Sequence, residues 1–272
     1  LQGGIDGESV ISLETGKNFS HEINKIVYAE SATISPSREV EILNPNGVIT
    51  TKFNKEKEFY YFLKENNYGV INALHGKFGE DGTIQKILNK YKITFSGPSA
   101  ESAGITFNKY NTQKFVREIV ITPKTIKITK HSHIDINAIN KRLGDYPYII
   151  KPNRGGSSIG VDLIRNKNQL ASYLSNINTT VLLQEFIRGR EFSIGSINFD
   201  NKFWDLPITE IMPEGEFFDF KNKYTKDIAR EITPANIPIN ITAKIKKTAI
   251  NIHSKLDLGV YARHDFILKG ND

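Results

Sequence analysis

Lys-Pro-Asn-Arg-Gly-Gly-Ser-Ser-Ile-Gly, residues 151–160, is the stretch of sequence that decides the fold. Strand-like runs at 146–151 and 159–164 flank it, so we expect an antiparallel hairpin with a glycine-rich loop. Its Gly-Gly-Ser-Ser turn exposes backbone N–H groups that bind anionic oxygens, and Lys151 adds a point charge for a phosphate. The alternative is a hairpin loop that glycine merely makes flexible, and a glycine-rich loop alone favours that alternative. Because a P-loop joins a strand to a helix, a loop between two strands indicates a different nucleotide-binding fold.

The rest of the chain alternates strand-like and helix-like patterns, which predicts an α/β or α+β fold. Glycine and proline near residues 97 and 187 mark the expected seams between compact parts. We expect strands at 40–43, 48–53, 70–74, 124–129, 146–151, 159–164, 181–186, 192–199, 202–208 and 261–268, and helices at 83–90, 109–119 and 239–256.

Composition narrows the class of protein. The 272 residues are 39% hydrophobic and 24% charged, which is typical of a soluble globular protein. The absence of cysteine excludes disulfides and thiol nucleophiles. No apolar run approaches the roughly 18 residues of a membrane helix, so we expect no membrane contact. The net charge of +6 is spread along the chain without a dense basic block, so we expect no nucleic-acid partner.

A second motif, His75-Gly-Lys-Phe-Gly-Glu-Asp-Gly82, follows the apolar run at 70–74. A loop at the carboxyl end of a buried strand is where ligands gather in open α/β sheets, so His75 is a candidate for ligand contact. Glu80 and Asp81 precede a predicted helix, and acids at that position ordinarily just cap the helix.

Two further segments carry chemistry-bearing side chains. In Phe217–Thr225 we expect Lys223 to meet a phosphate and Tyr224 to hydrogen-bond a polar partner, unless this is an aromatic strand edge with a charged loop. Strand alternation places Arg263 and Asp265 on one face. Such a pair is often a simple salt bridge, but it also suits an anionic substrate beside Mg²⁺.

The histidines give no catalytic pattern of their own. No serine–histidine–acid triad is apparent from spacing. We expect His131 and His133 in a polar loop, and His21 and His253 in helices without a chemical role.

Taken together and in order, these motifs resemble the D-alanine–D-alanine ligase family of the ATP-grasp superfamily. The resemblance runs from Gly3-Gly4 to Asp265, and its most specific segments are 75–82, 151–160 and Lys223-Tyr224. It implies an ATP-grasp fold with an N-terminal Rossmann-like domain (1–97), a central lid domain (98–187) and a C-terminal antiparallel-sheet domain (188–272).

The resemblance also implies an ATP site. Two lysines would hold the phosphates, two serines would cover them, residues 184–187 would line the adenine slot, and an acid would bind the ribose. Gln184 stands where the family often has Glu, and its amide oxygen can still accept from the adenine amino group. The residues so assigned are Lys109, Lys151, Ser157, Ser158, Gln184, Glu185, Phe186, Ile187, Glu191 and Lys223.

The substrate residues follow from the same resemblance. Glu8, His75, Ser157 and Arg263 would bind substrate, and Glu8, Ser157, Tyr224 and Arg263 would be catalytic. Asp265 would be the first Mg²⁺ ligand. The family implies two Mg²⁺ ions, for which Mn²⁺ can substitute, and the remaining ligands are expected beyond Asp272.

The implied activity is ATP-dependent ligation of two D-alanines through an acyl phosphate, for peptidoglycan precursor synthesis in the cytoplasm. The resemblance also suggests a homodimer. The family's first strand and its Glu-x-Asn metal ligands are missing here, so we expect a sequence trimmed at both ends and a 272-residue chain that does not turn over. The alternatives are another ATP-grasp carboxylate–amine ligase with a different acceptor, or a non-catalytic nucleotide-binding homologue.

Overall fold

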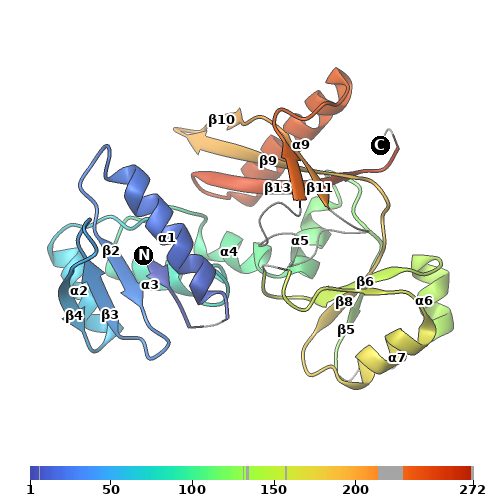
Figure 1. Cartoon of the computed structure of the whole chain (residues 1–272), viewed down its shortest axis with the longest axis horizontal. Helices are drawn as coiled ribbons and strands as arrows, with labels where there is room; N and C mark the ends of the chain where they lie inside the picture. The colour runs from blue at the N-terminus through green and yellow to red at the C-terminus, as the bar shows by residue number, and fades with distance from the viewer. Residues whose placement is uncertain (6, 131, 133–134, 157, 214–228, 271–272) are drawn as a thin grey trace. The chain divides into compact units, whose positions relative to one another are not determined.

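The computed structural model describes residues 1–5, 7–130, 132, 135–156, 158–213 and 229–270 (Figure 1). These residues divide into two compact units, one comprising Leu1–Phe107 with Asp257–Val260, the other Asn108–Leu256 with Tyr261–Asp272. The first unit has one apolar core, and the second has two, one at each of its sheets. The division into domains at residues 97 and 187 stays a prediction.

The first unit contains a mixed sheet with the strand order β1-β2-β3-β4. β1 and β2 are parallel, and the later neighbours are antiparallel. Asn44 fixes the turn between the predicted strands at 40–43 and 48–53, because its side-chain oxygen accepts hydrogen bonds from the N–H groups of Asn46 and Val48, and Gly47 has a positive φ of 78°. The elements of this unit are β1 (Gln2–Gly3), α1 (Ser9–Ile23), β2 (Ser31–Ile34), β3 (Val40–Leu43), β4 (Ile49–Phe53), α2 (Glu56–Glu65), α3 (Thr83–Tyr91) and α4 (Ala100–Thr106).

Residues 70–74 differ from the prediction of a strand. Val70 forms an isolated parallel bridge with Phe95, and no ladder continues from it. The N–H of Asn72 donates to Ser96 Oγ and the N–H of Leu74 donates to Asn72 Oδ1, while the N–H of Ala73 between them donates to the carbonyl oxygen of Leu1. Short polar side chains thus replace two of the ladder bonds that a strand would need.

The second unit begins with an antiparallel sheet of strand order β5-β8-β6-β7. β6 and β7 form the predicted hairpin around the glycine-rich loop, and β8 pairs with β5 and β6. In Figure 1, α6 and α7 lie on one side of this sheet. Tyr148, Ile150 and Leu183 are fully buried on that side. The elements are α5 (Lys109–Val116), β5 (Thr125–Ile128), α6 (Ile136–Leu143), β6 (Tyr148–Pro152), β7 (Asp162–Ile164), α7 (Lys167–Ser175) and β8 (Val181–Glu185).

The same unit continues with a second antiparallel sheet, in which β9 pairs with β10, β11 and β13. Helix α9 covers its apolar face, where Phe192 and Ile194 pack against Ile241, Ile245 and Ala249. The predicted helix at 239–256 and the predicted strand at 261–268 are confirmed. The elements are β9 (Arg190–Phe199), β10 (Lys202–Asp205), β11 (Thr209–Pro213), β12 (Ala229–Ile232), α9 (Ile239–Leu256) and β13 (Tyr261–Leu268).

The described part of the chain contains no helix with the length and apolar character needed to cross a bilayer.

Gly82 provides a test of this fold. It precedes α3 with a φ of 90°, and a Cβ there would lie 2.3 Å from the carbonyl oxygen of Ala100. Gly47 has a similar φ of 78° but open space around it, so it is a matched control in the same unit. We expect Gly47→Ala to cost about 1–2 kcal/mol of unfolding free energy from backbone conformation alone. Gly82→Ala should cost at least about 1 kcal/mol more, because backbone must also move. Urea unfolding followed by circular dichroism compares the variants, and equal losses would contradict the packing.

Candidate active site

The register of the β5-β8-β6-β7 sheet sets the first part of the site. Lys151 lies opposite Leu182, and Gln184 lies opposite both Ile149 and Thr125. Because directly paired residues point to the same side of a sheet, these side chains share one face. The neighbouring residues of each strand point the other way, into the core. The structure therefore places the two predicted ATP residues Lys151 and Gln184 on the face opposite the sheet's apolar core.

The buried Gln184 amide has a fixed orientation. Gln184 Nε2 donates to Thr125 Oγ1 at 2.7 Å, and Thr125 Oγ1 donates to the carbonyl oxygen of Pro123 at 2.9 Å. The single hydroxyl proton of Thr125 is used on Pro123, so this hydroxyl accepts from the amide NH₂ and cannot donate to the amide oxygen. The Gln184 amide oxygen is thereby left as the acceptor end of the group.

The residues after Gln184 end the strand. Glu185 exchanges backbone and side-chain bonds with Lys124, whose N–H donates to Glu185 Oε1 at 2.7 Å. Phe186 and Ile187 follow as half-buried loop residues, and the Arg188 guanidinium lies 5.7 Å from the centre of the Phe186 ring. The predicted adenine-slot residues thus form one continuous segment at the end of β8.

The glycine-rich loop is fastened to the start of α5. Asn108 and Arg154 form an antiparallel bridge, and the N–H of Lys109 donates to the carbonyl oxygen of Asn153 at 3.0 Å. The Lys109 ammonium donates to the carbonyl oxygen of Gly155. Lys109 and Lys151, 42 positions apart in the sequence, therefore both lie next to the same loop. Ser158, in this loop, is half-buried with a φ of 56°.

The sheet of β9 and β13 brings together another group of predicted residues. Asp265 pairs with Ser193, and the positions two residues away, Glu191 and Arg263, lie on the same face by alternation. Ser193 Oγ donates to Asp265 Oδ1 at 2.9 Å. The Arg263 guanidinium contacts both carboxylate oxygens of Asp265 at 3.2 Å. The predicted shared face of Arg263 and Asp265 is confirmed, and in this structure the two form an exposed salt bridge.

The first unit brings Glu8 and His75 to neighbouring segments. Glu8 is buried at the start of α1, and one and two turns later Ser12 Oγ donates to the carbonyl oxygen of Ala73 while Thr15 Oγ1 lies 3.0 Å from His75 Nε2. One face of α1 therefore runs along the segment that ends at His75.

Of the two acidic residues of the second motif, Asp81 bonds to the start of the following helix, as expected for a capping acid, and Glu80 bonds within the loop. Asp81 Oδ1 accepts from the N–H of Thr83 at the start of α3, and Glu80 Oε2 accepts from the N–H of Gly76 at 2.7 Å. Both carboxylates thus stabilise the loop itself.

Three predicted site residues lie outside the described residues: Ser157, Lys223 and Tyr224. Their assignments stay predictions.

The structure also shows a buried network that the sequence reading did not find. Ser196 Oγ lies 2.6 Å from His253 Nδ1 and 2.9 Å from His264 Nε2, beneath the strand that carries Arg263 and Asp265. Burial and the nearby His253 lower the pKa of His264 to about 4, so His264 is neutral at physiological pH. No local pattern predicts this network, because its members come from a strand, a helix and a second strand.

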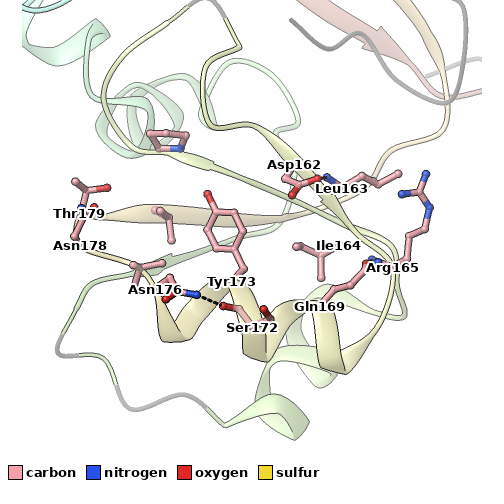
Figure 2. Close-up of a pocket in the computed structure, with 13 residues that line it drawn as sticks. Asp162, Leu163, Ile164, Arg165, Gln169, Ser172, Tyr173, Asn176, Asn178 and Thr179 are labelled. Atoms are coloured by element: carbon pink, nitrogen blue, oxygen red, sulfur yellow. Dashed lines mark hydrogen bonds between the residues drawn. The ribbon is translucent and has the colours of Figure 1, made fainter. Parts of the chain in front are cut away.

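A cavity of about 550 Å³ lies between α7 and the β5-β8-β6-β7 sheet (Figure 2). Asp162, Ile164 and Tyr173 line it, and the Tyr173 hydroxyl donates to the carbonyl oxygen of Gly160 at 3.3 Å. Asp162 pairs with Ile150 and Ile164 pairs with Tyr148, so the cavity is on the core side of the sheet. None of the predicted site residues lines it.

Comparisons with known proteins agree on one family. The model for the D-ala D-ala ligase C-terminus matches residues 114–272. A D-alanine–D-alanine ligase from Clostridium beijerinckii is 33% identical over 273 residues, covering 98% of this chain and 82% of that protein. The chain belongs to the D-alanine–D-alanine ligase family.

Solved structures of D-alanine–D-alanine ligases share the fold. The crystal structure of the ligase from Bacillus anthracis has a TM-score of 0.75 and 30% sequence identity, covering 99% of this chain and 81% of that one. The structure of that ligase complexed with ATP has a TM-score of 0.72 and 27% identity, covering 99% and 80%. The predicted ATP-grasp fold and the predicted class, an ATP-dependent ligase, are confirmed.

This ligase offers part of a magnesium site in its described residues. Within those residues, no three His, Asp or Glu side chains are grouped as metal ligands. Asp265 presents a carboxylate, 58% exposed, on the same face of the sheet as Glu191 and Arg263. Mg²⁺ in nucleotide sites takes one or two carboxylates together with substrate phosphates. Asp265 therefore fits one ion shared with a nucleotide, and a second ion would need further ligands.

An ion pair next to Glu191 provides a pH test. Arg190 donates to both carboxylate oxygens of Glu210, at 2.7 and 2.8 Å, and these bonds lower the pKa of Glu210 below its ordinary value of 4.5. A lowered folded-state pKa stabilises the fold above the ordinary value, and that contribution is lost as pH falls through the lowered value. Because Arg190 is half-exposed, we expect Glu210→Gln to cost about 1–2 kcal/mol at pH 7.

The difference in unfolding free energy between wild type and Glu210→Gln should shrink below pH 4.5. Urea unfolding from pH 7 to pH 3 measures it. Glu231→Gln, on the exposed side of neighbouring β12, is the control that should change little at any pH. A difference independent of pH would contradict the assigned role of the pair.

Proposed function

We propose that this protein ligates two D-alanines to D-alanyl-D-alanine at the expense of ATP, for peptidoglycan precursor synthesis in the cytoplasm. The observation that carries the proposal is a D-alanine–D-alanine ligase relative that aligns with 98% of the chain. It is supported by Lys109 and Lys151 beside one glycine-rich loop, and by Arg263 and Asp265 on one face of the second sheet.

In the first step, the carboxylate of one D-alanine attacks the γ-phosphorus of ATP, which gives an acyl phosphate and ADP. Lys109 and Lys151 hold the phosphates and offset their charge, so their part is positioning and electrostatic stabilisation. Lys223 adds a third cation, and Ser157 and Ser158 cover the phosphates. Asp265 would hold Mg²⁺, which would supply charge neutralisation at the phosphates.

In the second step, the free amine of the other D-alanine attacks the acyl carbon, and phosphate leaves. Arg263 stabilises the oxyanion that develops on the acyl group, so the Arg263 guanidinium exchanges its bond to Asp265 for a bond to that oxygen. Glu8 meets the ammonium of the first D-alanine, and His75 lies near its carboxylate. Ser157 and Tyr224 are assigned to excluding water, which would otherwise hydrolyse the acyl phosphate.

Recognition of adenine fits the orientation of Gln184. The amide NH₂ is used on Thr125, which leaves the amide oxygen to accept from the adenine amino group. Glu185, Phe186 and Ile187 line the same slot, and Glu191 binds the ribose hydroxyls. We further propose the three domains 1–97, 98–187 and 188–272, a second Mg²⁺ or Mn²⁺, and a homodimer.

Lys151→Ala tests the phosphate site. In the full-length protein we expect phosphate release to require both ATP and D-alanine. Loss of a charged hydrogen bond should raise KM for ATP roughly 10- to 100-fold. Lys167→Ala, on the opposite side of the sheet at the start of α7, is the matched control and should leave KM unchanged.

The acceptor is tested in the same assay. Phosphate release without D-alanine, or faster release with D-serine or D-lactate as the second substrate, would point to a ligase of different specificity. No phosphate release with any acceptor, despite ATP binding, would favour the non-catalytic homologue.

Thr125→Val tests the adenine slot. Valine removes the hydroxyl that accepts from the Gln184 amide, so the amide is free to turn its NH₂ toward the base. Inosine triphosphate carries a carbonyl oxygen where ATP carries the amino group, so the wild type should prefer ATP. We expect the ATP preference to fall several-fold, up to roughly tenfold, in Thr125→Val. Thr129→Val, just past β5, should keep it, and an unchanged preference in both variants would contradict the orientation.

A further inference from the structure

The start of α5 is held by a residue far away in the sequence. A helix leaves its first N–H groups without partners inside the helix. Here the N–H of Asn111 donates to the Asn108 side-chain oxygen and the N–H of Thr112 donates to the Asn108 carbonyl oxygen, as at a locally capped helix. The N–H groups of the two residues before them, Lys109 and Tyr110, donate to the carbonyl and side-chain oxygens of Asn153, each at 3.0 Å.

Asn153 itself is rigidly placed. It is 5% exposed, and its N–H donates to the carbonyl oxygen of Thr180 at 3.0 Å, just before β8 begins. It follows Pro152, the last residue of β6, which pairs with Val181. The position of Asn153 is therefore set by the register of the sheet.

This arrangement joins the two phosphate-binding candidates through one residue. Lys151 lies on β6, two residues before Asn153, and Lys109 is the first residue of the helix that Asn153 holds. The Lys109 ammonium also reaches the carbonyl oxygen of Gly155, two residues beyond Asn153. The spacing of both cations is thus fixed relative to Asn153.

We propose that Asn153 is a positioning residue for the triphosphate, because its side chain holds α5 so that Lys109 and Lys151 meet the same phosphates. This inference rests on the proposed ATP site. Without the Asn153 side chain, the N–H of Tyr110 loses its acceptor, and the first turn of α5 is fastened to the loop only through the backbone bonds of Asn108 and Lys109. Lys109 then spends part of its time out of reach of the phosphate.

The chain offers a matched control in Asn166. Asn166 Oδ1 accepts from the N–H of Gln169 at 3.0 Å and so caps α7 with the same kind of bond. Helix α7 carries none of the predicted ATP residues. Asn153→Ala and Asn166→Ala therefore each remove one helix-capping bond, but only the first disturbs the lysines.

The experiment is calorimetric titration of wild type, Asn153→Ala and Asn166→Ala with Mg-ATP and with adenosine. Adenosine lacks phosphates, so its affinity reports the slot at Gln184 alone. We expect Asn153→Ala to bind Mg-ATP about 5- to 30-fold more weakly, with unchanged affinity for adenosine. Asn166→Ala should match the wild type for both. If Asn153→Ala does not fold, Asn153→Ser takes its place, because the serine hydroxyl can hydrogen-bond a water molecule that fills the space left by the asparagine amide.

The outcomes separate this inference from the proposed function. Equal affinities of the two variants for Mg-ATP would overturn the role of Asn153 while leaving the ATP site intact. A parallel loss of adenosine binding in Asn153→Ala would also overturn it, because the damage would then be general. A wild-type protein that binds no Mg-ATP would refute the proposed function itself.

Discussion

Cross-strand pairing of β8 with β5 and β6 is the constraint on which the ATP-binding face depends. A slip of one residue would turn Lys151 and Gln184 into the core and expose Ile150 and Leu183. Ile150 and Leu183 are fully buried, and exposing each would cost about 1.5–3 kcal/mol. Burial of the apolar face of the sheet therefore fixes the face on which the Lys151 and Gln184 side chains lie. The sheet of β9 and β13 repeats the principle, because its apolar face packs on α9 and leaves Asp265 on the other face.

Much of this framework is predictable from the sequence, for physical reasons that differ between elements. The helix at 239–256 repeats its apolar residues over several turns, and the strand at 261–268 alternates, so both have the predicted bounds. The hairpin of β6 and β7 is predictable because glycine-rich residues separate two apolar runs. Lys109 and Arg263 are assigned from a family resemblance; the structure places Lys109 beside the glycine-rich loop and Arg263 beside Asp265, and the roles of both stay predictions.

The remainder depends on contacts between distant segments, which local patterns do not contain. The run at 70–74 is as apolar as a strand, yet Asn72 and Ser96 take the hydrogen bonds that a ladder would use. Thr125, Asn153 and Ser193 acquire their partners only once strand register is known. Knowing the register of β9 and β13 would have revealed Ser193, because it lies directly opposite Asp265.

The most direct test of this account is a crystal structure of the full-length protein with Mg²⁺ and a non-hydrolysable ATP analogue. The account predicts that the phosphates contact Lys109 and Lys151, and that the adenine amino group donates to the Gln184 side-chain oxygen. A nucleotide bound on the opposite face of the sheet, in the cavity lined by Asp162 and Tyr173, would contradict it.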